Sequence, residues 1–208
     1  MKLELYAHGK INLGLDVIGE RPDGYHEVKM IMQTVEVCDR LEFEDIDEDE
    51  IQLKSDAAFL PLDGDNLICK ACRLMKDEYD IKKGVRISLE KHIPVAAGMA
   101  GGSADAAAAL VAMNEIFALG LSRDRLMELG VKLGADVPYC IMKGTALSEG
   151  IGEKLTELAP MPDCYILIAK PGISVSTKEA YGGLVLDEHT LHPDIDGMVE
   201  AIKAGDLK

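Results

Sequence analysis

The feature that most constrains this chain is a glycine-rich stretch, PVAAGMAGGSADAAAAL, between Pro94 and Leu110. It follows an alternating segment, GVRISLEKH, that predicts a β-strand, and it ends in small residues that favour a helix. Gly98, Gly101 and Gly102 would let the backbone approach a ligand closely, and the free N–H groups at a helix N-terminus attract anions. Neither the Walker A pattern nor GxGxxG is present. The stretch alone therefore leaves two interpretations open, a phosphate-binding loop or a tight turn before a closely packed helix.

The remaining pattern predicts an α+β fold. Alternating apolar and polar residues, or short apolar runs, predict strands over residues 3–18, 26–37, 39–46, 84–92 and 164–171. Helical spacing predicts helices that start after Asp65, near Ser103, at an N-cap on Ser122, and over residues 177–184. The acidic run 44–50 predicts a solvated turn. The strands are not followed one by one by helices, which argues against a doubly wound sheet.

Composition excludes several classes of function. The chain of 208 residues has a net charge of -15, which argues against a nucleic-acid partner because phosphate contacts need Lys and Arg. No apolar run approaches the roughly 20 residues of a membrane span, and the N-terminus has no signal-peptide pattern. Five cysteines suit a reducing compartment, so we expect a cytoplasmic protein without a membrane partner. Cys69 and Cys72 form a CxxC in a predicted helix, where core packing is the simpler interpretation.

Four motifs occur in order: GKINLGLDV from Gly9, RPDGYHE from Arg21, the glycine-rich stretch, and GADVPYC from Gly134. Together, from Leu5 to about Tyr181, they resemble the GHMP kinase superfamily. The resemblance implies a two-lobed α+β fold with the active site in the cleft between the lobes. It places a ribosomal-protein-S5-domain-2-like, ATP-binding lobe at residues 1–155. The start of a ferredoxin-like C-terminal lobe, incomplete in this chain, would then follow at residues 156–208.

Within that superfamily the motifs are similar to those of kinases of the non-mevalonate (methylerythritol phosphate) route to isoprenoid precursors. Those kinases transfer phosphate from ATP, with Mg²⁺, to the 2-hydroxyl of cytidine diphosphate methylerythritol. The resemblance thus implies two small-molecule partners, ATP and this acceptor, and it assigns no protein ligands to the metal. Two alternatives stay open: a related kinase acting on homoserine, mevalonate or a sugar, and a non-catalytic nucleotide-binding fragment.

The resemblance assigns ATP binding to the glycine-rich stretch and to one residue before the first predicted helix. Met99 replaces a Leu of the family pattern with little change in volume, and Ala104 replaces a Ser and so removes a hydroxyl. Asn66 is expected to line the adenine pocket, although Asn before a helix is also an ordinary cap. The expected loop residues are Pro94, Val95, Ala96, Ala97, Gly98, Met99, Ala100, Gly101, Gly102, Ser103 and Ala104.

Two residues are expected to be catalytic. Asp136 resembles the family's proton acceptor, although an isolated Asp before Val-Pro is more often a turn or cap residue. Lys10 resembles the family's catalytic lysine, which would keep that carboxylate ionised and offset charge on the transferred phosphoryl group. Both residue types suit phosphoryl transfer, which depends mainly on positioning and charge stabilisation.

The acceptor is expected to contact residues from both ends of the motif series. Asn12 lies two residues after Lys10 on the same strand face and could hydrogen-bond the acceptor hydroxyl. By resemblance, Tyr25 and Tyr181 would stack on the cytosine while His26 recognises the base edge. Thr177 would contact the polar part of the acceptor. Relatives also carry a further Gly-Ser-rich motif beyond the last motif found here, so we expect the chain to be a truncated or short form.

Overall fold

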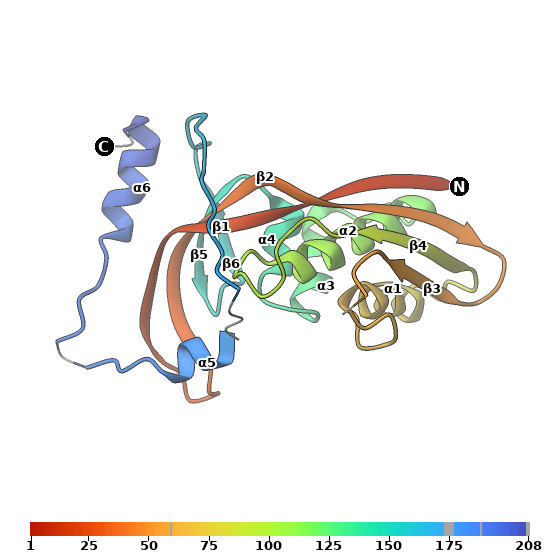
Figure 1. The fold of residues 1–208 in the computed structure, drawn as a ribbon, viewed down its shortest axis with the longest axis horizontal. Coiled ribbons are helices and arrows are strands. Elements are labelled where there is room, and N and C mark those ends of the chain that lie inside the picture. Colours follow the sequence, from red (N-terminus) through yellow and green to blue (C-terminus); the bar gives the residue numbers. More distant parts are fainter. Residues whose placement is uncertain (59, 173–176, 188, 207–208) are drawn as a thin grey trace. The chain divides into compact units, whose positions relative to one another are not determined.

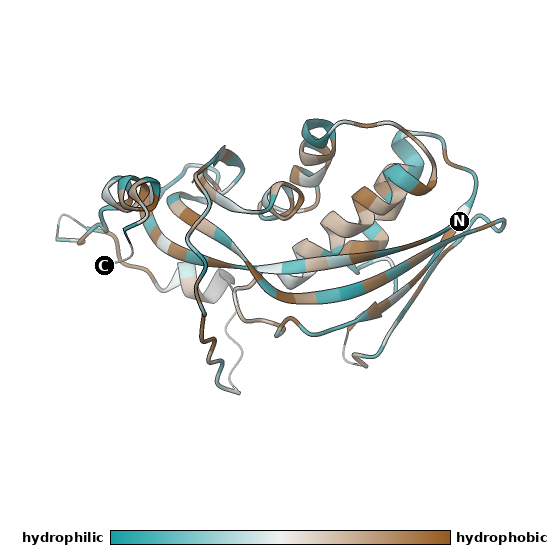
Figure 2. Ribbon diagram, turned by 90° about the horizontal axis from the view of Figure 1, so that it is seen from above, coloured by the Kyte–Doolittle hydropathy of each residue, from teal (hydrophilic) through white to brown (hydrophobic). Residues whose placement is uncertain are grey.

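The computed structural model describes residues 1–58, 60–172, 177–187 and 189–206, and the side chains of residues 177–179 lie outside this description. The chain divides into two compact units. The first comprises Met1–Gly9, Val35–Ile93 and Ala100–Met142, and the second comprises Lys10–Thr34, Pro94–Met99 and Lys143–Lys208. Two long paired strands, β1 (Lys2–Glu20) and β2 (His26–Ile46), contribute residues to both units. Hydrophobic and hydrophilic residues alternate along them, as Figure 2 shows.

In the first unit the C-terminal half of β2 pairs antiparallel with β4 (Gly84–Glu90), from Arg40 opposite Glu90 to Ile46 opposite Gly84. The short strand β3 (Ile51–Ser55) pairs in parallel with the other side of β4. The alternating side chains predicted to be apolar on β4 are buried, namely Val85, Ile87 and Leu89. A period of two therefore places one face of this part of the sheet in the core.

Four helices complete the first unit: α1 (Leu67–Glu78), α2 (Gly101–Ile116), α3 (Arg123–Val131) and α4 (Val137–Met142). Figure 1 shows them grouped, with α2 in contact with the other three. Residues 104–110 of α2 are buried all around the helix, and five of these seven residues are alanines, whose small side chains permit close packing. The predicted N-caps are confirmed, because Asn66 Oδ1 accepts from Ile68 N and Ser122 Oγ accepts from Arg125 N.

In the second unit the N-terminal half of β2 pairs antiparallel with β5 (Thr145–Gly150), which pairs in turn with β6 (Lys154–Glu157). The unit also contains the short α5 (Thr177–Gly182) and α6 (Ile195–Ala204). Ile31 of β2 forms an apolar core with three residues of α6, Ile195, Val199 and Ile202. Gly14 of β1 lies against the same helix, since a Cβ there would come 2.8 Å from Met198 Sδ.

The structure corrects several expectations. The predicted strand over residues 164–171 is wrong: no strand is present there, and the Tyr165 and Leu167 side chains are almost fully exposed. In the described part of the chain no neighbouring strand pairs with this segment, so its β-favouring residues have no sheet to join. The two strands predicted over 26–37 and 39–46 are one strand, β2, because a buried Asp39 continues it. The acidic run is strand as far as Ile46 and turns in solvent only after it.

Two helix boundaries also differ from expectation. Helix α2 begins at Gly101, two residues before the predicted start at Ser103. Helix α4 is not among the predicted helices; it begins at Val137, and Pro138 is tolerated because it lies in the first turn. Across the described ranges, no helix has both the length and the hydropathy needed to cross a bilayer.

Candidate active site

The backbone of the glycine-rich loop alternates between left-handed and ordinary conformations. Ala96, Gly98 and Ala100 have φ of 52°, 69° and 56°, whereas the residues between them do not have positive φ. Alternation of this kind is typical of backbone nests, in which successive N–H groups bind an anion. Alanine is uncommon in this region because its Cβ crowds the backbone, at a cost of roughly 1–2 kcal/mol per residue. Strain kept at two alanines of one loop favours a functional loop over an ordinary turn.

The helix that follows adds free donors. Its N-cap, Ala100, has no side chain that can cap, and the first intrahelical bond runs from Ala104 N to Ala100 O at 2.8 Å. The N–H groups of Gly101, Gly102 and Ser103 have no acceptor within the described residues. These donors and the positive end of the helix dipole suit a phosphate group. Ala104 differs from them, because its side chain is buried and its N–H is used within the helix.

Close packing explains one of the two helical glycines. A Cβ on Gly101 would lie 3.1 Å from Ile93 Cγ2 and 3.3 Å from Lys91 Nζ, both tighter than usual contacts. A Cβ on Gly102 would lie 3.5 Å from Leu67 Cδ1, an ordinary contact. The packed-helix interpretation of the stretch therefore holds at Gly101, whereas the anion-binding interpretation fits the backbone of the whole loop.

Asp136 lies in the first unit, directly before α4, where its carbonyl accepts from Cys140 N at 3.1 Å. The side chain is half-buried, and its carboxylate has no hydrogen-bond or ion-pair partner among the residues described. The turn before it contacts the start of α2, since a Cβ on Gly134 would lie 4.0 Å from Ser103 Oγ. An unpaired carboxylate in this position is available to accept a proton.

Lys10 lies on β1 in the second unit and is buried, with only 6 % of its surface exposed. Its ammonium donates to Asn12 Oδ1 at 3.1 Å, which confirms that the two side chains share a strand face. Its backbone nitrogen donates to Met99 O at 3.1 Å and so joins β1 to the glycine-rich loop. Among the described residues no carboxylate forms an ion pair with this lysine, so its ammonium has room for an anionic partner.

The turn after β1 presents the predicted cytosine-binding residues. Gly24, at φ 80°, closes a β-turn by donating to Arg21 O at 3.0 Å. The turn leaves Tyr25 exposed and His26 half-buried. The His26 ring lies 5.0 Å from the Tyr181 ring, centroid to centroid, at a tilt of 41°. In Figure 1, α5, which carries Tyr181, lies beside this turn.

For two other expected site residues, Thr177 and Asn66, the part of the chain that the structure describes shows no contact specific to a ligand-binding role. Thr177 is the first residue of α5, and its side chain lies outside the described residues. Asn66 Oδ1 accepts from Ile68 N at 2.9 Å and Nδ2 donates to Pro61 O at 2.8 Å, so both ends of the amide serve the local fold. Its capping role is confirmed, and its adenine role stays a prediction.

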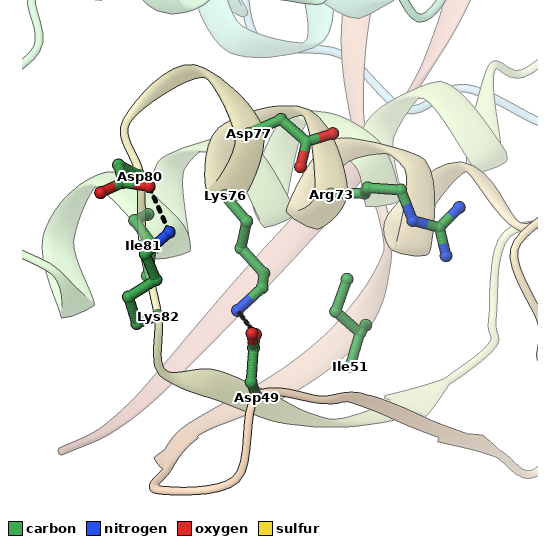
Figure 3. A pocket seen from close by; sticks show the side chains of 8 residues that line it. All are labelled: Asp49, Ile51, Arg73, Lys76, Asp77, Asp80, Ile81 and Lys82. Atoms are coloured by element: carbon green, nitrogen blue, oxygen red, sulfur yellow. Dashed lines mark hydrogen bonds and ion pairs between the residues drawn. The ribbon is translucent and has the colours of Figure 1, made fainter.

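Figure 3 shows a separate cavity of about 530 Å³ on the first unit. Its lysines are already paired with carboxylates of the same cavity, Lys76 with Asp49 at 2.6 Å and Lys82 with Asp80. None of the residues expected in the active site lines it, and we assign it no role. The lining residues are Asp49, Ile51, Arg73, Lys76, Asp77, Asp80, Ile81 and Lys82.

Comparison with known proteins agrees with this geometry. Residues 66–144 match the GHMP kinases N terminal domain. The chain is 58% identical over 205 residues to a 4-diphosphocytidyl-2-C-methyl-D-erythritol kinase of Lachnoclostridium phytofermentans, covering 99% of this chain and 70% of that protein. It is 52% identical over 208 residues to the enzyme of the same name from Bacillus cytotoxicus, covering 100% of this chain and 72% of that one. The chain belongs to the 4-diphosphocytidyl-2-C-methyl-D-erythritol kinase family.

Solved structures agree with membership of the 4-diphosphocytidyl-2-C-methyl-D-erythritol kinase family. A crystal structure of 4-(cytidine 5'-diphospho)-2C-methyl-D-erythritol kinase superposes with a TM-score of 0.80 at 31% identity, over 98% of this chain and 72% of that one. Homoserine kinase from Cytophaga hutchinsonii superposes with a TM-score of 0.71 at 17% identity, over 99% and 68% of the two chains, which shows a shared fold alone. The predicted α+β GHMP kinase fold is confirmed.

Sequence reasoning missed one group of charged residues, which lies beside the glycine-rich loop. Asp39 of β2 and Asp105 of α2 are buried, and the side chain of Lys91, after β4, contacts both and is only 7% exposed. The sequence does carry a signal for it, because each charged residue lies in an apolar context. Asp39 lies within a strand, Lys91 follows a strand, and Asp105 lies among alanines. The sequence pattern instead predicts a separate strand that begins at Asp39.

Proposed function

We propose that this protein transfers the γ-phosphate of ATP to the 2-hydroxyl of 4-diphosphocytidyl-2-C-methyl-D-erythritol, a step of non-mevalonate isoprenoid precursor synthesis. The observation that carries the proposal is the glycine-rich loop, with its alternating left-handed residues and the free N–H groups of Gly101–Ser103. Its chemistry suits a triphosphate, and the loop lies in a chain 58% identical to a kinase of that name. Residues 1–155 would form the ATP-binding lobe, and 156–208 would begin the C-terminal lobe.

Asp136 would accept the proton of the acceptor hydroxyl as the new P–O bond forms. A carboxylate with no partner in the described part of the chain has both oxygens available for this role. Lys10 would stabilise negative charge on the transferred phosphoryl group, because its buried ammonium is held by a neutral amide and not by a carboxylate. Asn12, which orients that ammonium, would also reach the acceptor hydroxyl.

Mg²⁺ would be bound mainly by the phosphates of ATP. The described residues contain no group of three or more His, Cys, Asp or Glu side chains that could hold a metal ion. Mg²⁺ in nucleotide sites usually keeps several waters and uses few protein carboxylates, so the ATP–Mg²⁺ complex fits a site of this kind. When bound, the ion would neutralise charge on the phosphates.

The diphosphocytidyl end of the acceptor would lie against the turn that carries Tyr25 and His26. The exposed Tyr25 ring offers a face for stacking, and the His26 ring lies against the ring of Tyr181. His26 would then distinguish cytosine by hydrogen bonding, since stacking alone accepts any base. Thr177 is proposed to contact the polar part of the same substrate.

The test is ADP release by the full-length gene product in a coupled assay, with the cytidyl acceptor compared with homoserine, mevalonate and galactose. We expect kcat/KM for the cytidyl acceptor to exceed the others by at least about 100-fold, because only this acceptor offers a base to the aromatic residues. Asp136→Asn should lower kcat by about 10²–10⁴-fold, the usual contribution of a general base. Absence of ADP release with the cytidyl acceptor would refute the proposal.

A further inference from the structure

A buried group of three charged side chains lies in the first unit, outside the residues assigned to ATP or the acceptor. Lys91 Nζ donates to Asp39 Oδ2 and, at 2.9 Å, to Asp105 Oδ2. The three side chains are between 0% and 7% exposed. We call Asp39, Lys91 and Asp105 the anchor network.

The anchor network contacts the chain on both sides of the phosphate-binding loop. Before the loop, Asp39 Oδ1 accepts from the backbone nitrogens of His92 and Ile93, at 2.6 Å and 2.8 Å. After the loop, Asp105 belongs to the second turn of α2. The Lys91 ammonium also lies directly beside the first residue of that helix, since a Cβ on Gly101 would be 3.3 Å from Nζ. One ammonium and two carboxylates thus join the last residues before the loop to the first turns after it.

The network has one more carboxylate than ammonium groups. With both carboxylates ionised it would carry a buried net charge of one negative unit close to the phosphate-binding donors. A single proton on Asp105 makes it neutral. The Asp105 Oδ1 atom is buried and has no hydrogen-bond partner in the described part of the protein, a costly state for an ionised oxygen.

We propose that the anchor network positions the ATP phosphate loop and that its proton count sets how strongly the loop binds the triphosphate. This inference rests on the proposed function. In the neutral form, the network holds Gly101–Ser103 in place without opposing an anion. In the ionised form, a negative charge next to these donors repels the phosphates and weakens binding. Asp39, Lys91 and Asp105 are positioning residues, because they act through the backbone of the loop and α2.

The charged groups around Asp105 support a transition near neutral pH. Burial raises the pKa of Asp105 to about 7; Lys91 opposes this shift, and the Asp39 carboxylate adds to it. Within the described residues these two groups are the charged side chains that face Asp105, Asp39 from β2 and Lys91 from the segment after β4. Asp39 Oδ1 accepts two backbone hydrogen bonds, whereas Asp105 Oδ1 has no partner among the described residues, so we place the single proton on Asp105.

The experiment measures binding of β,γ-methylene-ATP with Mg²⁺ to the full-length gene product by calorimetry at pH 6.0 and pH 8.5. For each protein we take the ratio of the Kd at pH 8.5 to the Kd at pH 6.0. This ratio should be about fivefold larger in the wild type than in Asp105→Asn, because only the wild type gains a negative charge near the phosphates. The asparagine amide can donate to Asp39 and accept from Lys91, so this variant keeps the neutral network at both pH values. Because the analogue titrates identically in both experiments, the comparison isolates Asp105.

A second variant separates positioning from simple loss of stability. Asp105→Ala should raise the Kd of the ATP analogue about tenfold and leave the Kd of the cytidyl acceptor within about twofold, at a temperature where the protein is folded. Lys82→Met, at an exposed lysine away from the loop, is the control and should change neither Kd. A purely structural role would lower the melting temperature without this difference between the two ligands.

Three results would overturn the inference or its premise. Equal pH dependence in the wild type and Asp105→Asn refutes the role of the proton, and this comparison decides the matter if Asp105→Ala does not fold. Wild-type affinity in a folded Asp105→Ala refutes positioning. A wild type that binds no ATP analogue at either pH refutes the proposed function itself, which separates that failure from a failure of the inference.

Discussion

The side-chain oxygen of Asn66 lies 2.9 Å from the backbone nitrogen of Ile68 and closes the N-terminus of α1. The amide nitrogen of the same side chain donates to Pro61 O at 2.8 Å, so the residue expected to line the adenine pocket also maintains the local fold. A substitution at this position therefore changes two quantities, stability and nucleotide binding, and a single variant cannot separate them.

A pair of variants at Asn66 can separate the effect on stability from the effect on nucleotide binding. Asn66→Ala should lower the free energy of unfolding by about 1 kcal/mol, the usual cost of losing an N-cap. Asn66→Asp keeps a capping oxygen but has no amide to donate, so it should retain most of the stability. If Asn66 recognises adenine, both variants raise the KM for ATP; urea unfolding and ATP kinetics on the same preparations give the two quantities. An unchanged KM in a folded Asn66→Asp would limit the residue to capping.

Lys10→Met should lower kcat by about 100-fold or more, because the substitution removes the cation proposed to stabilise the transferred phosphoryl group. The melting temperature should stay the same or rise, since the lysine is buried beside a neutral amide and methionine has a similar unbranched stem. Lys54→Met, at an exposed position on β3, is the control for loss of a positive charge. A large drop in stability with unchanged kcat would assign Lys10 to the fold instead.

Gly101→Ala and Gly102→Ala should have opposite effects on stability. The new methyl group at residue 101 meets Ile93 and the Lys91 ammonium at 3.1 and 3.3 Å and should destabilise the protein by about 1–3 kcal/mol. At residue 102 the new methyl group makes one ordinary contact. Replacing glycine in a helix should then dominate and raise the free energy of unfolding by about 0.5–1 kcal/mol. Denaturant unfolding measures both, and an equal effect of the two variants would contradict the packing described for Gly101.

The pKa of Asp105 also predicts how stability depends on pH. Because its pKa is raised to about 7 in the folded protein, the native state holds a proton that the unfolded chain releases near pH 4. This contribution is fully present below about pH 4 and is lost as pH rises to about 7. The unfolding free energy of the wild type minus that of Asp105→Asn should therefore decrease between pH 4.5 and 7.5 in urea titrations. A constant difference would show that Asp105 does not titrate in this range.

Local signals predicted much of this fold from sequence. Ser122 and Asn66 precede amphipathic segments, and both cap helices as expected. The segment over residues 164–171 failed because β-propensity describes a residue's fit to a sheet, and only a neighbouring strand supplies the sheet. The sequence pattern predicts two strands where β2 is continuous, because the partner that compensates the charge of Asp39 inside the strand, Lys91, is distant in sequence.

The candidate site was predictable to a different extent. The position of the loop followed from its glycines, and the motif order singled out Lys10 and Asp136. The left-handed conformations at Ala96 and Ala100 did not follow, because alanine ordinarily avoids positive φ and nothing local requires it there. The anchor network likewise depends on contacts between residues 52 and 14 positions apart in the chain, which no short pattern encodes.

The two left-handed alanines of the glycine-rich loop place the conformational cost of its shape in folding, before any ligand binds. Three glycines could adopt the same backbone with less strain, but they would also allow many other shapes in the absence of ligand. Alanine occupies two of the three positions with positive φ, 96 and 100. The free-energy cost of this backbone is therefore met when the protein folds, and alanine restricts the loop to fewer alternative shapes than glycine would. Under the proposed function, nucleotide would meet a preorganised surface, and little of its binding energy would go into ordering the loop.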